Sequence, residues 1–411
     1  MINEAKIAFR NLKRQKRRTV LTVSILSFGV VAVLIFSALA GSFKNMMIGQ
    51  ITDSMMGHLQ IHERGYIMSL DNLPLDKMMK IKKIEKLTKI LDKIPGIEAY
   101  SLRILIGGML SNYLETTNIK VAAIKPGMES KVIPLLPGRI KSGEFLKKGG
   151  ILIPDLVARG FNAEVGQDIV FIANNKDGSV NGQTLKITGI IETVAGPSGK
   201  YGYIHFDDAI KILRMDQVEV SEVAVRLKNI DDLDMVVKKI SRYLEKIPNK
   251  KGKPYFEVHS WKKLSPFFNI ARMIDLMSLF IRIILIAVVL ISVMNVMMMA
   301  VYERVPEIGT IAAIGTMPGK IRLIFLFEGF FLGAAGVIVG DIIGIVFIYM
   351  AKLMKFSVSF ARIDNILLDP SIPWDQMIFI AGIVIIISVI ASLEPAFRAS
   401  RMEPITALGY N

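Results

Sequence analysis

The stretch that decides the fold is Asn295–Gly319, NVMMMAVYERVPEIGTIAAIGTMPG. It begins in a long apolar run, and a charged turn with Glu303, Arg304 and Glu307 follows. A short amphipathic segment then closes at Pro318, and a second apolar run starts directly after it. Two long apolar helices joined by a compact helical lever are typical of a protein that passes force into a membrane.

The composition predicts a mixed protein. The chain has 411 residues, 52% of them hydrophobic, and a mean hydropathy of +0.46, too apolar for one soluble domain and too polar for membrane helices alone. The chain contains no cysteine, which excludes disulfides and thiolate metal sites. The formal net charge of +15 would suit nucleic acid, but seven cations between Lys6 and Arg18 directly precede an apolar run. Cations in that place are a membrane-topology signal, so we do not expect nucleic-acid binding.

Four apolar segments are long enough to cross a bilayer as helices. We predict membrane helices over residues 19–41, 273–302, 322–351 and 376–393. The first is longer than the apolar core of a cleaved signal peptide and lacks a good cleavage site, so we expect it to be retained. The residues 1–18 before it are predicted to form an amphipathic helix on the inner leaflet, with Ala8 and Leu12 among the residues that face lipid.

The distribution of cations predicts the topology. Basic residues precede the first span, and the tail contains Arg398 and Arg401, so the positive-inside rule places both termini in the cytoplasm. The cytoplasmic parts are then residues 1–18, a coupling segment over 303–321 and a tail over 394–411. Residues 42–272 and a loop over 352–375 lie on the outer side.

Residues 42–272 are predicted to form a large extracytoplasmic α/β domain. Apolar residues at helical spacing over 77–94 end at Pro95-Gly96, and short alternating runs bounded by Gly and Asn indicate strands. These strand-like runs concentrate at about 138–205, so we expect a split α/β subdomain with a β-rich insertion. The predicted fold class is therefore an α-helical membrane protein with four transmembrane helices and one large extracytoplasmic α/β domain.

Three motifs resemble those of the FtsX/MacB-type permeases of ABC transporters, and especially of the lipoprotein-releasing LolC/LolE permeases. They are AFRNLKRQKRRTVLT at Ala8–Thr22, ERVPEIGTIAAIGTMPGKIRLIFLFEG at Glu303–Gly329, and EPAFRASRMEPITALGY at Glu394–Tyr410. The resemblance covers essentially the full length. One departure is that the family usually has Arg-Ala after the EIG of the second motif, whereas this chain has Thr310-Ile311.

This resemblance implies a permease subunit that couples ATP hydrolysis by a separate ATPase to lipoprotein extraction. The lipoproteins would leave the outer leaflet of the bacterial inner membrane and pass to a periplasmic carrier. The implied partners are an ABC ATPase dimer, a second permease copy or paralogue, lipoprotein cargo, the carrier and membrane lipid. A MacB-like efflux permease that works with a periplasmic adaptor, or an FtsX-like transmembrane signalling scaffold, is the alternative.

The sequence shows no ATPase motif of its own. Gly196–Lys200 and Gly315–Lys320 look like fragments of a phosphate loop, but Tyr201 and Ile321 stand where a Ser or Thr would hold Mg²⁺. We also find no nucleophile–base constellation. We therefore expect a transport protein that is not an enzyme and binds no cofactor of its own, with ATP and Mg²⁺ on the partner ATPase.

Two sets of residues are the candidate sites. The coupling set would dock in a groove of the ATPase, with charges at its rim and isoleucines buried: Glu303, Arg304, Glu307, Ile308, Gly309, Ile311, Ile314 and Pro318. The cargo set would form an apolar path at the outer ends of the first two spans: Phe36, Leu39, Phe43, Met47, Leu276, Leu279, Phe280 and Ile283. Acyl chains need a continuous path, because each CH₂ that leaves lipid for water costs about 0.8 kcal/mol.

Three charged residues, Arg282, Glu328 and Asp341, lie within or beside the apolar spans, where charge is costly. We favour structural roles over a proton relay, because no histidine lies in any predicted span. Arg282 and Asp341 fall at similar heights on consecutive helices, so they either form an interhelical pair or snorkel separately to head groups. His58 and His62 do not predict a metal site, since strand residues four apart lie about 13 Å apart.

Overall fold

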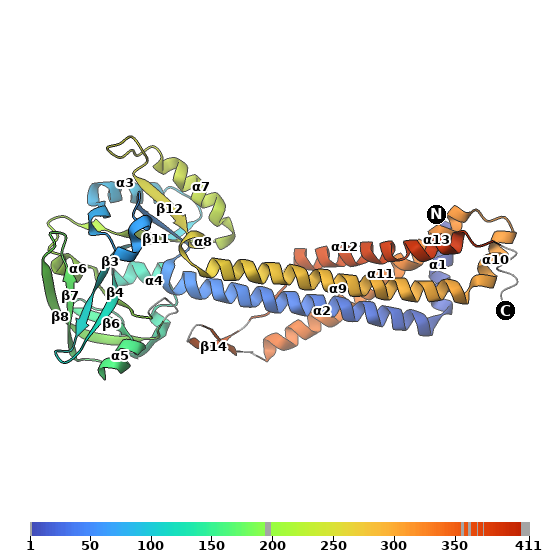
Figure 1. Cartoon of the computed structure of the whole chain (residues 1–411), viewed down its shortest axis with the longest axis horizontal. Helices are drawn as coiled ribbons and strands as arrows, with labels where there is room; N and C mark the ends of the chain where they lie inside the picture. The colour runs from blue at the N-terminus through green and yellow to red at the C-terminus, as the bar shows by residue number, and fades with distance from the viewer. Residues whose placement is uncertain are drawn as a thin grey trace. The chain divides into compact units, whose positions relative to one another are not determined.

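The computed structural model describes residues 2–193, 199–354, 357–360, 363–367, 369–372 and 374–403, and for residues 70–72, 358–360 and 363–367 it describes the backbone only. The chain divides into two compact units (Figure 1). The helical unit contains Met1–Asn45, Arg272–Ser357 and Leu367–Asn411, and the α/β unit contains Met46–Ala271 and Val358–Ile366. Most of the predicted phosphate-loop fragment Gly196–Lys200 and the end of the tail lie outside the described residues.

Among the described residues, four helices are long and apolar enough to cross a membrane. They are α2 (Lys16–Ile51), α9 (Phe267–Glu303), α11 (Pro318–Leu353) and α12 (Trp374–Ala391). Each overlaps one of the four predicted spans, and together with the α/β unit they confirm the predicted fold class. Three shorter helices accompany them: α1 (Ile2–Arg14), α10 (Val305–Ala313) and α13 (Leu393–Ser400).

Helix α11 packs closely against its neighbours because it carries a row of glycines. A Cβ built on Gly333 would lie 2.7 Å from the Ser388 side chain of α12, and a Cβ on Gly340 would lie 2.7 Å from Val30 of α2. Ser388 also donates its hydroxyl to the carbonyl of Gly329 at 2.7 Å. The full row is Gly329, Gly333, Gly336, Gly340 and Gly344. A larger residue in this row would push α2 or α12 away.

Helix α1 packs against α11. Ala8 is fully buried, Leu12 belongs to the apolar core of the helical unit, and the Phe9 ring meets the Phe331 ring edge-on at 5.6 Å. The prediction that Ala8 and Leu12 face lipid is therefore wrong, because the side of α1 that carries them is covered by protein. Ile7, on another side of α1, stays exposed.

The α/β unit is built on a ten-stranded mixed sheet in the order β12-β1-β11-β3-β4-β9-β6-β8-β5, with β7 paired to β3 and β8. The strands are β1 (Leu59–Glu63), β3 (Ile97–Ser111), β4 (Thr116–Ile124), β5 (Ile140–Gly143), β6 (Gly150–Pro154), β7 (Asp168–Asn174), β8 (Val180–Ile191), β9 (Tyr201–His205), β11 (Glu222–Leu227) and β12 (Phe256–Ser260). Two short pairs lie outside this sheet: β2 (Met79–Lys80) with β10 (Glu219–Val220), and β13 (Ser357–Phe360) with β14 (Ile363–Leu367).

Strand β3 joins the two halves of the sheet. Its first part, from Ile97 to Arg103, pairs with β11, and its second part, from Ile104 to Ser111, pairs with β4 and partly with β7. The strands of the predicted insertion at about 138–205 therefore extend the same sheet. A separate β subdomain is not formed, because the long β3 carries the hydrogen-bond ladder from one half into the other.

Helices of the α/β unit are short and amphipathic: α3 (Ile81–Leu91), α4 (Pro126–Val132), α5 (Asp155–Phe161), α6 (Phe206–Ile212), α7 (Leu233–Leu244) and α8 (Trp261–Leu264). Helical turns of other types lie at Thr52–Met56, Ile67–Asn72, Leu75–Lys77, Pro137–Arg139 and Ile230–Asp232. The predicted helix over 77–94 starts later than expected, since residues 79 and 80 pair with β10 as a strand.

A buried ion network holds the core of the α/β unit. Arg103 of β3 is 2% exposed; its Nε donates to Glu129 of α4 at 2.8 Å and its Nη1 to Glu222 of β11 at 2.9 Å. Nε2 of His62 lies 3.4 Å from the other oxygen of Glu222. Burial by itself would lower the pKa of Arg103, but the charges of Glu129 and Glu222 outweigh burial and raise that pKa. The network fixes β1, β3, β11 and α4 to one another.

Candidate functional site

The segment between α9 and α11 is a tight helical turn. Helix α9 ends at Glu303, and Arg304, with φ −115° and ψ 16°, leaves the helical conformation before α10 begins. Gly315 follows α10 with a φ of 95°, a left-handed conformation that glycine adopts without strain. Pro318 starts α11 at a position where no backbone N–H is needed. The sequence therefore fixes both ends of the turn.

Arg304 anchors this turn to α11. Its side chain points into the protein, and its Nη1 donates to Oε1 of Glu328 at 2.9 Å. Its Nε donates to Glu307 at 3.1 Å, and the Phe325 ring lies 6.0 Å from the guanidinium carbon. Glu328 is fully buried on α11. A buried carboxylate is tolerated only when it is paired, so Arg304 and Glu328 depend on each other.

Asn11 brings α1 to the same carboxylate. Its Nδ2 donates to Oε1 of Glu328 at 2.8 Å, so this oxygen accepts hydrogen bonds from two different elements. Oε2 of Glu328 has no hydrogen-bond partner among the described residues. We call Asn11, Arg304 and Glu328 the Glu328 anchor. The anchor joins α1, the start of α10 and the membrane-length helix α11 at one point.

Two weaker ion pairs lie around the Glu328 anchor. Arg18 of α2 lies 3.5 Å from Glu303, and Arg14 of α1 lies 3.6 Å from Glu307. Both carboxylates are about half exposed, so water screens the pairs and each contributes about 0–1 kcal/mol at most. These pairs add a contact between the turn and α2, but they contribute little to the stability of the turn.

The tip of the turn is the part that a partner could contact. Ile314 is 80% exposed and Met317 is 69% exposed, so two large apolar side chains within four residues face outward at the tip. Glu303, Glu307 and Pro318 are also exposed, and Ile311 is half-buried.

Three residues of the predicted coupling set face the interior of this chain instead of a partner. Arg304 belongs to the Glu328 anchor, and Ile308 and Gly309 are buried within this chain. The predictions that Arg304 lies at the rim of an ATPase groove and that Ile308 is buried in that groove are therefore wrong for this structure. The inward side of α10 already packs on the helical unit, where Ile308 belongs to the same apolar cluster as Val301 and Ile321.

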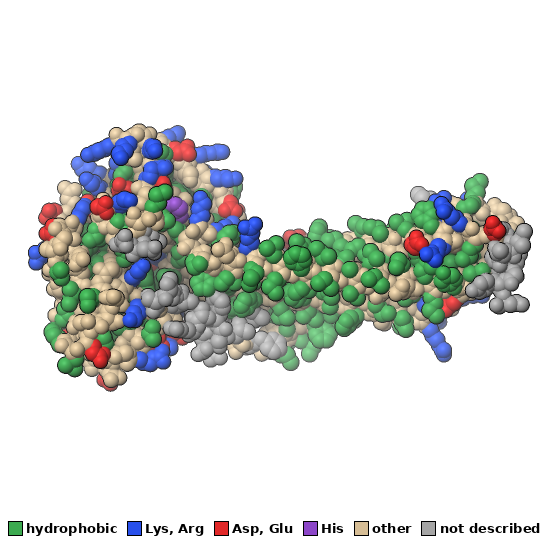
Figure 2. All heavy atoms as spheres, in the orientation of Figure 1, with side chains coloured by type: hydrophobic (Ala, Val, Ile, Leu, Met, Phe, Trp, Pro, Cys, Tyr) green, Lys and Arg blue, Asp and Glu red, His purple; other side chains and the backbone are tan. Residues whose placement is uncertain are grey.

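The predicted cargo set divides into exposed and covered side chains. Its four members on α9 are about half exposed or more: Leu276, Leu279, Phe280 and Ile283. On α2, Leu39 is exposed and Phe36 and Phe43 are half-buried. Met47 is fully buried, so the prediction that it lines an open acyl path is wrong. Figure 2 shows hydrophobic side chains along the length of the helical unit.

Helices α2 and α9 are tied by polar contacts. Nε of Arg282 donates to Oγ of Ser37 at 3.1 Å, and Nζ of Lys44 lies 2.7 Å from Asp275. Oδ1 of Asp341 on α11 is buried without a hydrogen-bond partner among the described residues. The predicted pair of Arg282 and Asp341 is therefore not formed in this structure, because Arg282 turns to α2.

His58 and His62 do not meet at one site. Nδ1 of His58 accepts a hydrogen bond from the backbone N–H of Leu227 at 3.0 Å, whereas His62 belongs to the buried network around Arg103. Within the described ranges, no three side chains of His, Cys, Asp or Glu lie close enough together to hold a metal ion.

Sequence reasoning missed two features that position the candidate site. One is the Glu328 anchor: Glu328 was visible as a charge in an apolar span, but its partners were not. The other is the glycine row of α11. Its G-x-x-x-G spacing at residues 329–333 and 336–340 is the sequence signal for closely packed membrane helices and would have predicted the contacts of α11.

Two family models match the chain. The FtsX-like permease C-terminal model matches residues 279–404, and the MacB-like periplasmic core domain model matches residues 19–243. The lipoprotein-releasing system transmembrane protein LolC of Neisseria meningitidis serogroup B is 23% identical, over 99% of this chain and 99% of its own length.

Two further comparisons were found. The lipoprotein-releasing system transmembrane protein LolE of Haemophilus influenzae is 19% identical, over 79% of this chain and 80% of its own length. Among solved structures, the periplasmic region of MacB from Actinobacillus actinomycetemcomitans matches with a TM-score of 0.36 and 11% identity, covering 51% of this chain and 92% of that structure.

Proposed function

This chain belongs to the FtsX/MacB-type family of ABC transporter permeases, and we propose that it extracts lipoproteins from the outer leaflet of the inner membrane and hands them to a periplasmic carrier. Membership of this family implies an ABC ATPase partner and a permease dimer. We infer that ATP and Mg²⁺ are bound by the ATPase alone. Both termini and the α9–α11 turn then lie in the cytoplasm, where the ATPase can reach them.

The observation that carries the coupling role is the contrast between the two ends of the α9–α11 turn. Its tip exposes Ile314 and Met317. Covering these apolar side chains with a partner would remove them from water, which favours binding. Its root is held by the Glu328 anchor. A push on the tip would therefore move α11 and α1 together instead of being absorbed by a loose connection, as a conformational signal requires.

Two observations support lipoprotein as the cargo. The similarity to LolC covers almost the full length of both chains, and α9 exposes a row of large apolar side chains at one end. Three acyl chains of about 15 carbons each would cost about 36 kcal/mol to expose to water. Such chains must pass from lipid to protein directly, and Leu276, Leu279 and Phe280 provide an apolar surface for that step.

Reconstitution tests this function. The chain and its ATPase are placed in proteoliposomes that contain a lipoprotein, and transfer to a soluble carrier is measured with and without ATP. We expect ATP-dependent transfer, and a photoreactive residue at position 279 should crosslink to the lipoprotein. Position 386 on α12, which is also exposed, serves as the matched control and should not crosslink.

Three results would contradict the proposal. One is equal crosslinking at positions 279 and 386, which would mean that the contact is non-specific. The others are ATP-dependent export of a soluble compound without lipoprotein transfer, and ATP-dependent activation of a cell-wall hydrolase without transfer. The last two results would support the efflux and signalling alternatives.

A further inference from the structure

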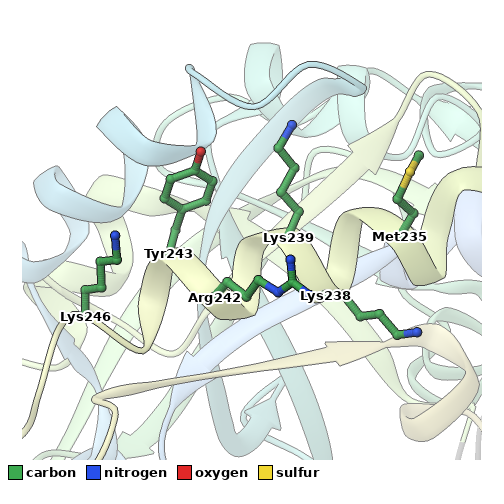
Figure 3. Close-up of a pocket in the computed structure, with 6 residues that line it drawn as sticks. All are labelled: Met235, Lys238, Lys239, Arg242, Tyr243 and Lys246. Carbon is green, nitrogen blue, oxygen red and sulfur yellow. The ribbon is translucent and has the colours of Figure 1, made fainter.

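Helix α7 presents a row of cations on the side that faces away from the sheet (Figure 3). Lys238, Lys239 and Arg242 stand along the helix with Met235 and Tyr243, and Lys246 lies two residues beyond its end. Together these side chains line an open pocket of about 650 Å³. The opposite side of α7 is buried in the core through Leu233, Val236, Ile240 and Leu244. The cations therefore dominate the free side of this amphipathic helix, on which Asp234 in the first turn and Glu245 at the C-cap are also exposed.

None of these four cations makes an ion pair or a side-chain hydrogen bond with another residue that the structure describes. The acidic neighbour Asp234 is already engaged, since Lys262 lies 2.8 Å from it. Like charges on neighbouring turns of a helix repel one another, so the row costs stability unless something outside the chain neutralises it.

Helix α3 and the turn over residues 249–253 extend this basic surface. Helix α3 contacts α7, and Lys83 connects the two regions, with its Nζ 3.5 Å from the Pro248 carbonyl and 5.0 Å from the centre of the Tyr255 ring. The further exposed cations are Lys82, Lys86 and Lys89 on α3, Lys93 just after it, and Lys250, Lys251 and Lys253 in the turn. Figure 2 shows lysine and arginine side chains gathered over this part of the α/β unit. We call this surface the basic face.

We propose that the basic face binds the anionic headgroup surface of a lipid bilayer. Its cations are mostly lysines, which are hydrated point charges that suit a diffuse array of phosphates, whereas specific bidentate recognition favours arginine. Lysine is also depleted at the cores of protein–protein interfaces. Met235 and Tyr243, which are 64% and 46% exposed, add the apolar and aromatic side chains found on helices that lie at membrane surfaces.

Membrane attachment makes such a contact effective even when it is weak. The α/β unit is joined to the membrane-length helices α2 and α9, so bilayer charges are present at a high effective concentration. Each lysine or arginine at an anionic surface strengthens binding by about fivefold. The four cations of the row therefore strengthen vesicle binding by roughly 500-fold in combination. This needs no deep pocket and does not depend on which cargo is carried.

A single fluorescent label tests the contact directly. The chain contains no cysteine, so Tyr243→Cys provides a unique site for an environment-sensitive dye in the full chain, held in zwitterionic nanodiscs. We expect its emission to shift when vesicles containing phosphatidylglycerol are added, but not with phosphatidylcholine vesicles. A label at Leu114→Cys, a residue that is 91% exposed in the β3–β4 turn, should stay silent.

Salt gives a second check on the same label. The shift at position 243 should be lost between about 0.1 M and about 1 M salt, as the Debye length falls from about 10 Å to about 3 Å. A shift that is equal with neutral vesicles, or that survives at high salt, would overturn the proposal. A label that ignores vesicles but responds to an acidic protein would also overturn it.

Matched variants separate this surface from net charge. The variant K238Q/K239Q/R242Q/K246Q removes the row and should weaken vesicle binding by roughly 500-fold. The control K120Q/K131Q/K186Q/K211Q removes four exposed cations from other elements of the α/β unit and should bind like the parent. Equal losses in the two variants would overturn the proposal.

Folding of the variants is checked independently. Glutamine and lysine have similar helix propensities, so circular dichroism of the α7 variant should match that of the parent. The variant K238R/K239R/K246R keeps the charge and should keep vesicle binding. Loss of binding in this charge-preserving variant would contradict the proposed attraction to a diffuse anionic surface.

Discussion

Each unit of the molecule buries an arginine against glutamate, and the two networks hold different kinds of structure. In the α/β unit, Arg103 is 2% exposed and joins strands and a helix of one core through Glu129 and Glu222. In the helical unit, Arg304 is 9% exposed and joins a turn, a membrane-length helix and α1 through Glu328. The same chemistry therefore fixes one fold in the first case and connects separate helices in the second.

Each network leaves a buried carboxylate oxygen unpaired: among the described residues, Oε2 of Glu129 in the first network has no hydrogen-bond partner. Glu222 accepts from Arg103 on one oxygen and contacts His62 with the other. Glu328 accepts twice on Oε1, and its Oε2 has no partner among the described residues. A buried oxygen without a hydrogen bond is costly, and both networks carry this cost. The difference lies in what they join: the first holds strands and a helix of one core, whereas the Glu328 anchor joins α1, the α9–α11 turn and α11.

Breaking the first network should have the largest effect on stability. Arg103→Met leaves two carboxylates buried without their cation, and we expect the α/β unit to lose about 3–5 kcal/mol. The chain has two tryptophans, Trp261 in the α/β unit and Trp374 in the helical unit. With Trp374→Phe, the thermal unfolding of the α/β unit can be followed by fluorescence.

The surface pair of Arg159 and Asp155 gives the control for this prediction. Arg159→Met removes a largely exposed cation and should change stability by about 0.5 kcal/mol or less. An equal loss in Arg103→Met and Arg159→Met would mean that the buried network does not hold the α/β unit.

Changing the exposed tip of the α9–α11 turn should weaken the binding of the proposed ATPase partner. Ile314→Asp places a charge on the exposed apolar tip, and we expect ATPase binding to weaken by about 30-fold, or about 2 kcal/mol, as at other interface hot spots. Binding of the ATPase to the detergent-solubilised chain measures this. Met235→Asp, at a similarly exposed position on α7, should bind normally. Normal binding by both variants would contradict the proposed docking tip.

Packing of α11 sharpens the comparison, because it tests the helix that the Glu328 anchor would move. Gly340→Ala places a methyl group 2.7 Å from Val30, and we expect a loss of about 1–3 kcal/mol in the helical unit. Gly382→Ala on α12 meets nothing within 4 Å and should be neutral or stabilise the helix by up to about 1 kcal/mol. Thermal unfolding of the two glycine variants is followed by the fluorescence of Trp374, in chains that also carry Trp261→Phe. The midpoints of the two variants should differ. Identical midpoints would show that α2 and α11 do not need this glycine.

Acid should weaken the α/β unit gradually through His259, whose ring centre lies 5.7 Å from that of His62. Burial, followed by the charge of His62, lowers the pKa of His259, so the unfolded chain binds a proton near pH 6.5 more readily than the folded chain. The contribution of His259 is complete above pH 6.5 and is lost as the pH falls through the folded pKa. His259→Gln should flatten this part of the stability profile by less than about 1 kcal/mol. An unchanged profile of the α/β unit would contradict this assignment.

The fold was largely predictable because its rules are local. A membrane helix needs about 20 apolar residues in a row, and such runs are visible in the sequence. The Glu328 anchor was not predictable, since Asn11 and Glu328 are 317 positions apart and a sequence does not show which helices meet. Arg304 was expected to face outward with Glu303 and Glu307, but it lies at the break between α9 and α10, where helical periodicity does not fix the direction of a side chain.

The measurement that tests the central claim most directly is a double-mutant cycle across Arg304 and Glu328. Lipoprotein released per ATP hydrolysed is measured for Arg304→Gln, Glu328→Gln and the double variant, with the surface pair of Arg398 and Glu394 treated in the same way as the control. If the anchor transmits motion from the tip, each single change should lower the yield by about tenfold, and the double variant should be no worse than the poorer single one. Additive losses, or single variants that release as much lipoprotein per ATP as the parent, would contradict the account.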